Sequence, residues 1–320
     1  DVTRAAGLHT PLGPSQAAVW LDVDLDGWLD LFIGRERSDL DPTGVAPSSL
    51  YLSQRDGTFL DVAAAWDVER PGYTKGVAAG DVDDDGDPDL LVALFGAPSR
   101  LYRNDGDRFT DVTAAWGLAI PPDAFVPWFA DVDQDGDLDL WVNHYADDAG
   151  IEDLLSPGFG HVLDDWLSAS VWAEPHAPHL RLYRNDGARF SDITLAAGLS
   201  PYRIVMGANV GDLNADGFPD ALLGTGAPSY EALLPHEALL NDTTGRFLRR
   251  TPDTRLGHLQ KGHGVAFGDL DGDGDQDLLA QLGGFYLGDG FPDAVWLNPT
   301  PDPHVLVLHL EGAAASRDPI

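Results

Sequence analysis

One short acidic string occurs five times in this chain, and an apolar run follows each copy at once. Every copy fits the pattern D-x-[DN]-x-D-G-x-x-D. Carboxylates two residues apart repel one another unless something neutralises them. The five copies are DVDLDGWLD (22–30), DVDDDGDPD (81–89), DVDQDGDLD (131–139), DLNADGFPD (212–220) and DLDGDGDQD (269–277).

A second motif alternates with the acidic string, so the chain is built from repeats. The acidic strings start 59, 50, 81 and 57 residues apart. Residues 1–8, DVTRAAGL, match the end of the second motif and read as the middle of a repeat, which favours a trimmed N-terminus. The copies of the second motif are LYLSQRDGTFLDVAAAW (50–66), LYRNDGDRFTDVTAAWGL (101–118), LYRNDGARFSDITLAAGL (182–199) and the weaker LLNDTTGRF (239–247).

Each repeat is expected to contain four short strands. The segment before the acidic string is apolar and rich in Gly and Ala, as in KGVAAGD (75–81). The apolar run after it, such as DLLVAL (89–94), suits a strand buried on both faces. An LYRN-like strand follows, and an Asp-Gly turn then leads to a fourth strand with FTDVT alternation. Four-stranded units at a period of about 40–60 residues predict an all-β fold, the β-propeller.

Five acidic strings predict five blades, although a larger ring stays open. The fifth repeat lacks a clear fourth strand, and residues 1–8 are expected to supply it. The long interval after the third string predicts a lid-like insertion at 144–179. We expect the propeller to span 1–303, followed by a separate C-terminal segment at 304–320.

The acidic string has the ligand spacing of a calcium loop. Side-chain oxygens at positions 1, 3, 5 and 9 converge on one centre, Gly at position 6 allows a sharp turn, and position 7 offers its carbonyl. Hard oxygen ligands in such a set suit Ca²⁺. About five Ca²⁺ ions are therefore expected. The predicted ligands are Asp22, Asp24, Asp26, Asp30, Asp81, Asp83, Asp85, Asp89, Asp131, Asp133, Asp135, Asp139, Asp212, Asn214, Asp216, Asp220, Asp269, Asp271, Asp273 and Asp277.

Together the two motifs resemble FG-GAP/VCBS-type β-propeller repeats, such as those of integrin α-subunits. The pattern LYRNDGDRFTDVTAAWGL is closer still to bacterial propellers of the ASPIC/UnbV, cartilage-acidic-protein-like group. HVLVLHLEGAAASRD (304–318) looks like the start of that group's C-terminal module. The resemblance implies a calcium-binding propeller that is extracellular or periplasmic, and it implies no single activity.

Composition excludes several classes of partner. The formal net charge is −34, from 53 acidic and 19 basic residues. Such a chain does not suit nucleic acid, which needs a basic surface, or an anionic membrane surface. No run of about 18 apolar residues is present, so no membrane insertion is expected. The chain has no cysteine, so bound calcium would serve in place of disulfides.

In a four-stranded meander, the acidic strings and the Asp-Gly turns lie at one end of the strands, and the irregular connections lie at the other. Those connections hold both lysines and most of the histidines, which are His9, His144, His161, His176, His179, His236, His258 and His263. Six positions before the first Asp of each string, on the innermost strand, the repeats carry Gln16, Lys75, Phe125, Met206 and His263.

Two functions fit this pattern, and a purely structural role, as a spacer domain of a larger secreted protein, stays open beside them. The first is a recognition module that binds a glycan or a protein on the side opposite the calcium loops. The alternative is an enzyme, with acid–base chemistry such as polysaccharide elimination or with a transition metal held by loop histidines. The candidate ligand-binding or catalytic residues are Lys75, His263, Arg203, Tyr73 and His144.

Overall fold

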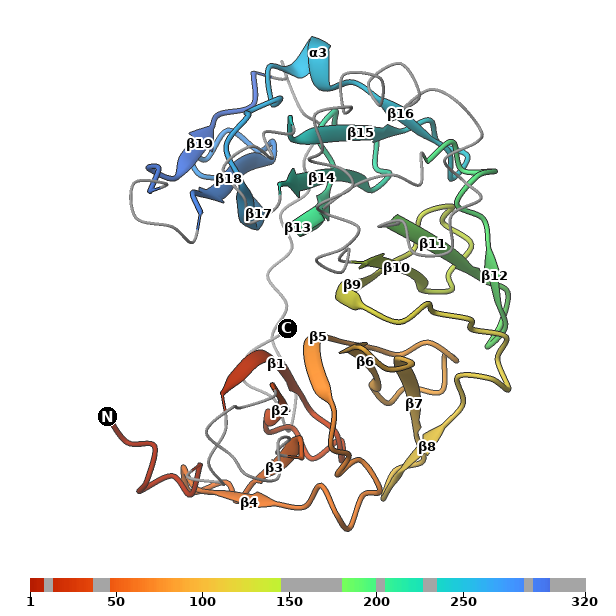
Figure 1. Cartoon of the computed structure of the whole chain (residues 1–320), viewed down its shortest axis with the longest axis vertical. Helices are drawn as coiled ribbons and strands as arrows, with labels where there is room; N and C mark the ends of the chain where they lie inside the picture. The colour runs from red at the N-terminus through yellow and green to blue at the C-terminus, as the bar shows by residue number, and fades with distance from the viewer. Residues whose placement is uncertain are drawn as a thin grey trace. The chain divides into compact units, whose positions relative to one another are not determined.

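A computed structural model of the chain describes residues 1–8, 14–36, 47–144, 180–199, 205–226, 235–284 and 290–299. In these ranges the regular elements are β-strands, apart from one short helix, α3 (Thr251–Thr254). The strands form five antiparallel sheets, which are the blades of a five-bladed β-propeller (Figure 1). The predicted all-β class and the predicted blade count are therefore confirmed.

Four of the sheets contain four strands in sequence order, as the repeat predicted. The first holds β1 (Ser15–Leu21), β2 (Asp30–Arg35), β3 (Ser49–Ser53) and β4 (Phe59–Asp61). The second holds β5 (Tyr73–Gly80), β6 (Asp89–Phe95), β7 (Arg100–Asn104) and β8 (Phe109–Asp111). The third holds β9 (Ala124–Ala130), β10 (Asp139–His144), β11 (Leu180–Asn185) and β12 (Phe190–Asp192). The fourth holds β13 (Val205–Gly211), β14 (Asp220–Thr225), β15 (Glu237–Asn241) and β16 (Phe247–Arg249).

The fifth sheet differs from the prediction. It has three strands in the described residues, β17 (Gly262–Gly268), β18 (Asp277–Leu282) and β19 (Ala294–Trp296). Residues 1–8 were expected to add a fourth strand but form a turn. In that turn the Ala6 carbonyl accepts the N–H of Phe59 at 2.8 Å, just as the Trp66 carbonyl accepts the N–H of Phe109. Residues 1–8 thus repeat the turn that follows a fourth strand, because Asp1 aligns with the last residue of such a strand.

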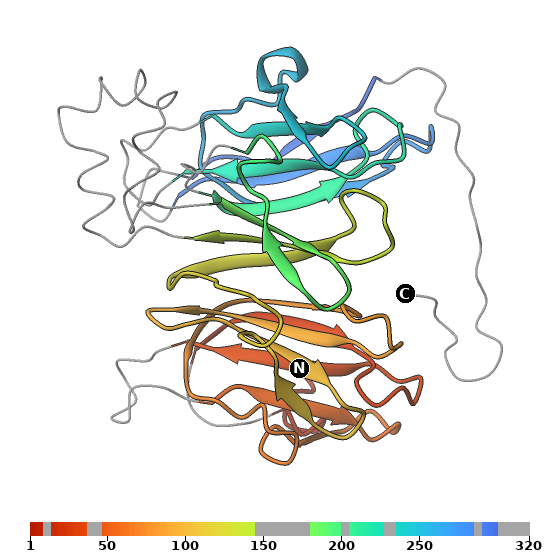
Figure 2. The same ribbon diagram turned by 90° about the vertical axis from the view of Figure 1, so that its right-hand side faces the viewer.

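The chain divides into two compact units. The first holds Asp1–Phe129 and Asn185–Ser191, and the second holds Ala130–Arg184 and Asp192–Leu306. Within each unit, successive strands of a sheet run in opposite directions, so the connections between them lie alternately at the two ends of the strands (Figure 2). Each acidic string is the hairpin between the first and second strands of its sheet, with position 9 as the first residue of the second strand.

Apolar side chains of neighbouring sheets pack together inside each unit. In the first unit, Phe32 and Leu50 of the first sheet join a buried cluster with Leu90, Tyr102 and Phe109 of the second. In the second unit, Leu222 and Ala238 of the fourth sheet pack with Leu278 of the fifth. The second strand of each four-stranded sheet is buried along nearly all of its length. This agrees with the apolar runs read from the sequence.

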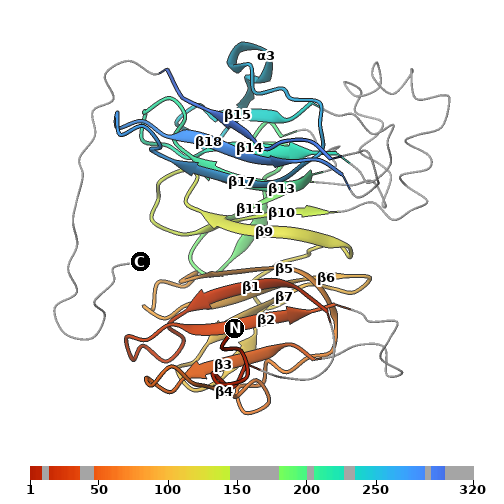
Figure 3. The ribbon, with the colours of Figure 1, turned by 90° about the vertical axis from the view of Figure 1, so that its left-hand side faces the viewer.

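The innermost strands approach one another closely at a glycine. In the second unit β13 lies beside β17 (Figure 3). A Cβ atom added at Gly207 would stand 1.2 Å from the carbonyl oxygen of His263, so no other residue fits that position without moving the backbone. The close approach of a neighbouring backbone is thus the physical cause of the glycine at position 207 of β13.

Three predicted features fall mainly outside the described residues. They are the insertion at 144–179, of which only His144 is described, the C-terminal segment 304–320, and Arg203. Among the described residues, no helix has the length and apolar character needed to span a membrane.

Candidate metal centres

All five acidic loops share one backbone conformation. The glycine at position 6 has a positive φ in each, from 86° at Gly27 to 101° at Gly136. Position 4 is also left-handed, as at Asp84 (φ 59°) and Gln134 (φ 58°). Two left-handed residues in six turn the loop tightly enough to bring positions 1, 3 and 5 around one point.

The aspartate at position 1 fixes that turn. In every loop its Oδ1 accepts the N–H of position 5 at 3.0–3.2 Å, and its Oδ2 accepts the N–H of the position 6 glycine at 2.8–3.1 Å. In the second loop, for example, Asp81 holds Asp85 and Gly86. The carboxylate that would bind an ion is thus oriented by the loop that it closes.

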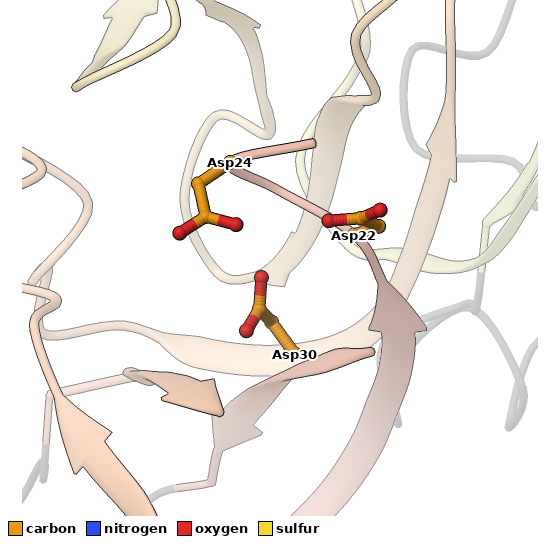
Figure 4. A group of neighbouring side chains, drawn as sticks. All are labelled: Asp22, Asp24 and Asp30. Atoms are coloured by element: carbon orange, nitrogen blue, oxygen red, sulfur yellow. The ribbon is translucent and has the colours of Figure 1, made fainter. Parts of the chain in front are cut away.

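Carboxylate oxygens converge in four of the five loops. In each, one oxygen from each of three aspartates lies within 4.8 Å of the others. Figure 4 shows this for Asp22, Asp24 and Asp30, whose carboxylates turn toward one another. The other groups are Asp81, Asp83 and Asp85; Asp131, Asp133 and Asp139; and Asp269, Asp271 and Asp273.

The position 3 aspartates carry the electrostatic cost of this arrangement. Burial and then the neighbouring carboxylate at position 5 raise the pKa values of Asp24, Asp83, Asp133 and Asp271 above the ordinary value. In the described residues, Oδ1 of Asp83 and Oδ1 of Asp133 are buried and accept no hydrogen bond. Buried acceptors without donors, crowded by like charge, fit a cation with oxygen ligands.

Position 7 adds a further carboxylate in the second loop. Asp87 Oδ1 is also a buried acceptor without a hydrogen-bond donor among the described residues. Burial and the Asp85 carboxylate raise the pKa of Asp87. The sequence assigned only the backbone carbonyl of position 7 to the ion, so this side chain was not foreseen.

The fourth loop has the weakest ligand set, as its sequence indicated. Asn214 stands at position 3 and donates its Nδ2 hydrogen to Asp216 Oδ2 at 2.9 Å. Its Oδ1 accepts the N–H of Asp216 at 3.1 Å. This loop therefore relieves part of its own repulsion with an internal amide, where the other loops place carboxylates.

The aspartate at position 9 has a second role that the sequence did not reveal. It is at most 1% exposed in all five loops. In the second loop, Asp89 Oδ2 accepts the N–H of Val82 at 3.0 Å and Oδ1 accepts the N–H of Asn104 at 2.8 Å. The first, fourth and fifth loops repeat both bonds. Position 9 therefore fastens the acidic loop to the third strand of the same sheet, whether or not it also faces an ion.

Burial dominates the titration of these position 9 groups. It raises the pKa of Asp30 to about 6, and the pKa values of Asp89 and Asp220 to about 7, against the lowering effect of the two backbone N–H donors. Without a cation nearby, the ionised forms of these groups are disfavoured in the folded protein.

An asparagine links four of the five sheets to the sheet before it in the chain. Asn104 ends β7 and donates its Nδ2 hydrogen to the carbonyl of Val23, at position 2 of the first acidic loop, at 2.8 Å. Asn185, Asn241 and Asn298 make the same bond to Val82, Val132 and Leu213. The Asn of the LYRN motif is therefore an inter-blade contact, and in the first sheet Ser53 stands in its place.

Four of the five residues aligned six positions before the acidic strings lie at backbone irregularities of the first strand of their sheet. The register of the first two strands shifts at Gln16, Lys75 and Met206, and between Gly262 and Val265, which includes His263. A bulge changes the direction in which its side chain points. The aligned position therefore differs in conformation from the rest of the strand, in keeping with the different residues that the repeats carry there.

The structure brings Tyr73 and Lys75 together. Lys75 Nζ lies 4.4 Å from the Tyr73 ring centroid and 2.6 Å from Glu36 Oε1. It also donates to Gln16 Oε1 at 2.7 Å. The ammonium group is therefore neutralised inside the first unit, by a partner that the sequence did not identify.

The residues predicted to form one site are divided between the two units, with Tyr73 and Lys75 in the first. His144 ends β10 and is buried, and His263 Nε2 bonds the carbonyl of Gly283 at 2.7 Å; both belong to the second unit. Arg203 lies outside the described residues. In the same unit, His236 is fully buried and stands 6.0 Å, ring to ring, from His258. His236 Nε2 bonds the carbonyl of Gln260 at 2.8 Å.

Comparison with known proteins gives one family match. The family of FG-GAP-like repeats matches residues 22–92, which span the first two acidic loops. This supports an FG-GAP-type propeller. No curated protein matches the chain.

Two solved structures match most of the chain. The chain is 14% identical to the rhamnogalacturonan lyase YesW, with a TM-score of 0.47 over 91% of this chain and 52% of that one. It is 15% identical to the exotype rhamnogalacturonan lyase YesX, with a TM-score of 0.45 over 89% of this chain and 47% of that one. The chain thus spans about half the length of these structures.

Proposed function

We propose that the chain is a calcium-stabilised recognition module, a propeller of the ASPIC/UnbV-like group that works in an extracellular or periplasmic setting. The observation that carries the proposal is the convergence of carboxylate oxygens in four of the acidic loops, together with the buried Oδ1 atoms of Asp83 and Asp133, which have no hydrogen-bond donor among the described residues. Calcium would be held by positions 1, 3 and 5 and the carbonyl of position 7, together with position 9 where its oxygen faces the centre.

The role of calcium in this proposal is structural. A divalent ion would cancel the repulsion within each loop and fix the hairpin between the first two strands. Ligands that bind only the folded state raise its stability by mass action, about 2.7 kcal/mol for each site at a hundred times the dissociation constant. Extracellular modules work with dissociation constants of about 10⁻⁴–10⁻³ M, concentrations that calcium reaches outside cells.

Elemental analysis and thermal unfolding test the proposal together. The protein is dialysed against a buffer from which other metals have been removed and to which calcium is added at a fixed free concentration. We then expect close to five calcium atoms per chain. Chelation should lower the melting temperature sharply. A protein that retains no calcium and melts at the same temperature with and without EDTA would refute the proposal.

Recognition is favoured over acid–base catalysis by the contacts of the candidate catalytic side chains. Lys75 is paired with Glu36, and His263 is bonded to a backbone carbonyl. Replacing both residues with alanine separates the two hypotheses. If the parent protein turns over a polysaccharide and the double variant binds it but no longer turns it over, the chain is an enzyme. If neither the parent nor the double variant turns over the polysaccharide and both bind it equally well, the result supports the recognition module.

A further inference from the structure

The second unit carries a depression between its acidic loops. Its volume is about 500 Å³, within the range of about 300–1,000 Å³ typical of small-ligand sites. It lies between the third loop (131–139) and the fourth loop (212–220), on the acidic-loop side of the sheets. The residues that line it are Ala130, Asp131, Gln134, Val210, Gly211, Asp212, Gly217, Phe218 and Pro219.

A side-chain amide joins the two loops that border the depression. Gln134, at position 4 of the third loop, has the left-handed backbone shared by that position. Its Nε2 donates to the carbonyl of Gly217 in the fourth loop at 2.5 Å. The two walls are thus held at a fixed separation by a bond between side chain and backbone.

The polar groups at this site favour a ligand that donates hydrogen bonds. Asp131 and Asp212 line the depression with carboxylates, and each carboxylate is held in place by the N–H of the glycine at position 6 of its own loop. The Gln134 amide nitrogen is engaged with Gly217, so the carbonyl oxygen is the end of that amide that can accept. Asp131 and Asp212 are also position 1 of the proposed calcium loops. A carboxylate has about four acceptor sites, and two backbone N–H groups and the ion would take three of them, so one is left on each. All three side chains therefore present an acceptor.

The remaining wall is apolar and contains two rings. Phe218 stands at position 7 of the fourth loop and Pro219 follows it. The second, third and fifth loops carry an aspartate at position 7, and the first carries Trp28. Because position 7 is expected to offer only its backbone carbonyl to calcium, the Phe218 side chain is available for packing against a ligand.

We infer that this depression binds an uncharged carbohydrate of one or two rings. A pyranose offers C–H faces to Phe218 and Pro219 and several hydroxyl donors to the oxygens of Gln134, Asp131 and Asp212. Uronates, sulfates and phosphates are disfavoured because the chain has a net charge of −34, which five Ca²⁺ ions would reduce only to −24. The inference deepens the proposed function and rests on it, since the loops that form both walls are the proposed calcium loops.

This site lies on the acidic-loop side of the sheets, whereas the sequence predicted a ligand on the opposite side. That expectation concerned the opposite loops, of which 9–13, 37–46, 145–179, 200–204, 227–234 and 285–289 lie outside the described residues. A ligand there stays a prediction. The carbohydrate site stands on residues that are described throughout.

Saturation-transfer NMR and titration calorimetry test the inference on the calcium-loaded chain. The probes are a panel of neutral mono- and disaccharides, with glucuronate as the anionic probe and spermidine as the cationic one. We expect a neutral sugar to bind and glucuronate to bind more weakly. Phe218→Ala should lower the affinity for the neutral sugar about tenfold, the loss of one ring contact with its buried area. Gln134→Asn, which tolerates the left-handed backbone, should lower it as well.

Trp28→Ala supplies the matched control, because it removes the aromatic ring at the same position of the first loop. It should leave sugar binding unchanged, and all three variants should keep the calcium content of the parent protein. Calcium-loaded protein that binds no neutral sugar, or that binds spermidine alone, would overturn the carbohydrate inference and leave the calcium proposal standing. Absence of calcium from the parent protein would instead overturn the proposed function.

Discussion

Consider replacing Asp89 with alanine in the second acidic loop. Asp89 is fully buried, and its two oxygens accept the N–H groups of Val82 at 3.0 Å and of Asn104 at 2.8 Å. Alanine removes both acceptors and leaves two buried donors without partners. Each such donor costs about 1–3 kcal/mol, so the free energy of unfolding should fall by about 2–6 kcal/mol.

Asp83→Asn in the same loop is the contrasting change. Burial and the carboxylate of Asp85 raise the pKa of Asp83, so its charge destabilises the metal-free fold. The neutral and nearly isosteric asparagine should therefore leave the metal-free protein as stable as the parent, or more so. In calcium, the same change removes a charged ligand and should lower stability.

Thermal unfolding followed by circular dichroism, once in excess EDTA and once in excess calcium, distinguishes the two aspartates. We expect Asp89→Ala to lower the melting temperature by about 4–24 °C in both buffers, since a loss of 1 kcal/mol lowers it by about 2–4 °C in a large domain. Asp83→Asn should lower it in calcium alone. Asp89→Asn keeps one acceptor oxygen and should fall between the parent and Asp89→Ala, which keeps the comparison informative if the alanine variant does not fold.

The reasoning is wrong if Asp89→Ala behaves like Asp83→Asn, with its whole effect confined to calcium buffer. Position 9 would then act only as a metal ligand, and its two backbone hydrogen bonds would contribute nothing measurable. It is equally wrong if Asp83→Asn destabilises the chelated protein, because the loop would then not be strained by its own charge.

Three further changes test other contacts. Asn104→Ala removes the bond to the Val23 carbonyl and should cost about 1–3 kcal/mol by denaturant unfolding, clearly more than Ser53→Ala at the equivalent position of the first sheet; equal costs would mean that the asparagine link is not stabilising. Burial lowers the pKa of His236, so the unfolded state takes up the proton first, and stability should fall as pH drops below the ordinary histidine pKa of about 6.5. Melting temperatures measured against pH should show a shallower fall for His236→Gln, and parallel curves would contradict the assignment. Lys75→Met and Glu36→Gln, alone and combined, should give a coupling free energy of about 1 kcal/mol for this largely buried pair, and additive effects would show that the ion pair is not stabilising.

The repeat made most of the fold predictable. The acidic string marks the hairpin between the first two strands, and the apolar run after it marks a buried strand, as in Asp89–Phe95. The N-terminal segment was misread because its sequence matches both the end of a fourth strand and the turn beyond it. The backbone hydrogen bonds within this segment, such as the one from the Ala6 N–H to the Val2 carbonyl, show that residues 1–8 form the turn.

The candidate site was predictable only where its contacts are local. Positions 1 to 6 of a loop are close in sequence, so their convergence follows from spacing and glycine. The partners of the other groups are not close: Asp89 meets the N–H of Asn104, fifteen residues on, and Lys75 meets Glu36, thirty-nine residues back. Such pairs depend on strand register and sheet packing, which a single sequence does not encode in its spacing.

The residue at position 2 of a loop links the ion site to its own sheet and to the next sheet. Val82 stands between two proposed calcium ligands, Asp81 and Asp83. Its N–H donates to Asp89 of the same sheet, and its carbonyl accepts the Asn185 amide of the next. Because one peptide segment is shared by the ion site, the sheet and the neighbouring sheet, neutralising the loop also holds the acceptor that the next blade needs. Calcium binding should therefore stabilise pairs of blades rather than single hairpins. This accounts physically for the acidic string and the asparagine of the LYRN motif occurring in the same repeat.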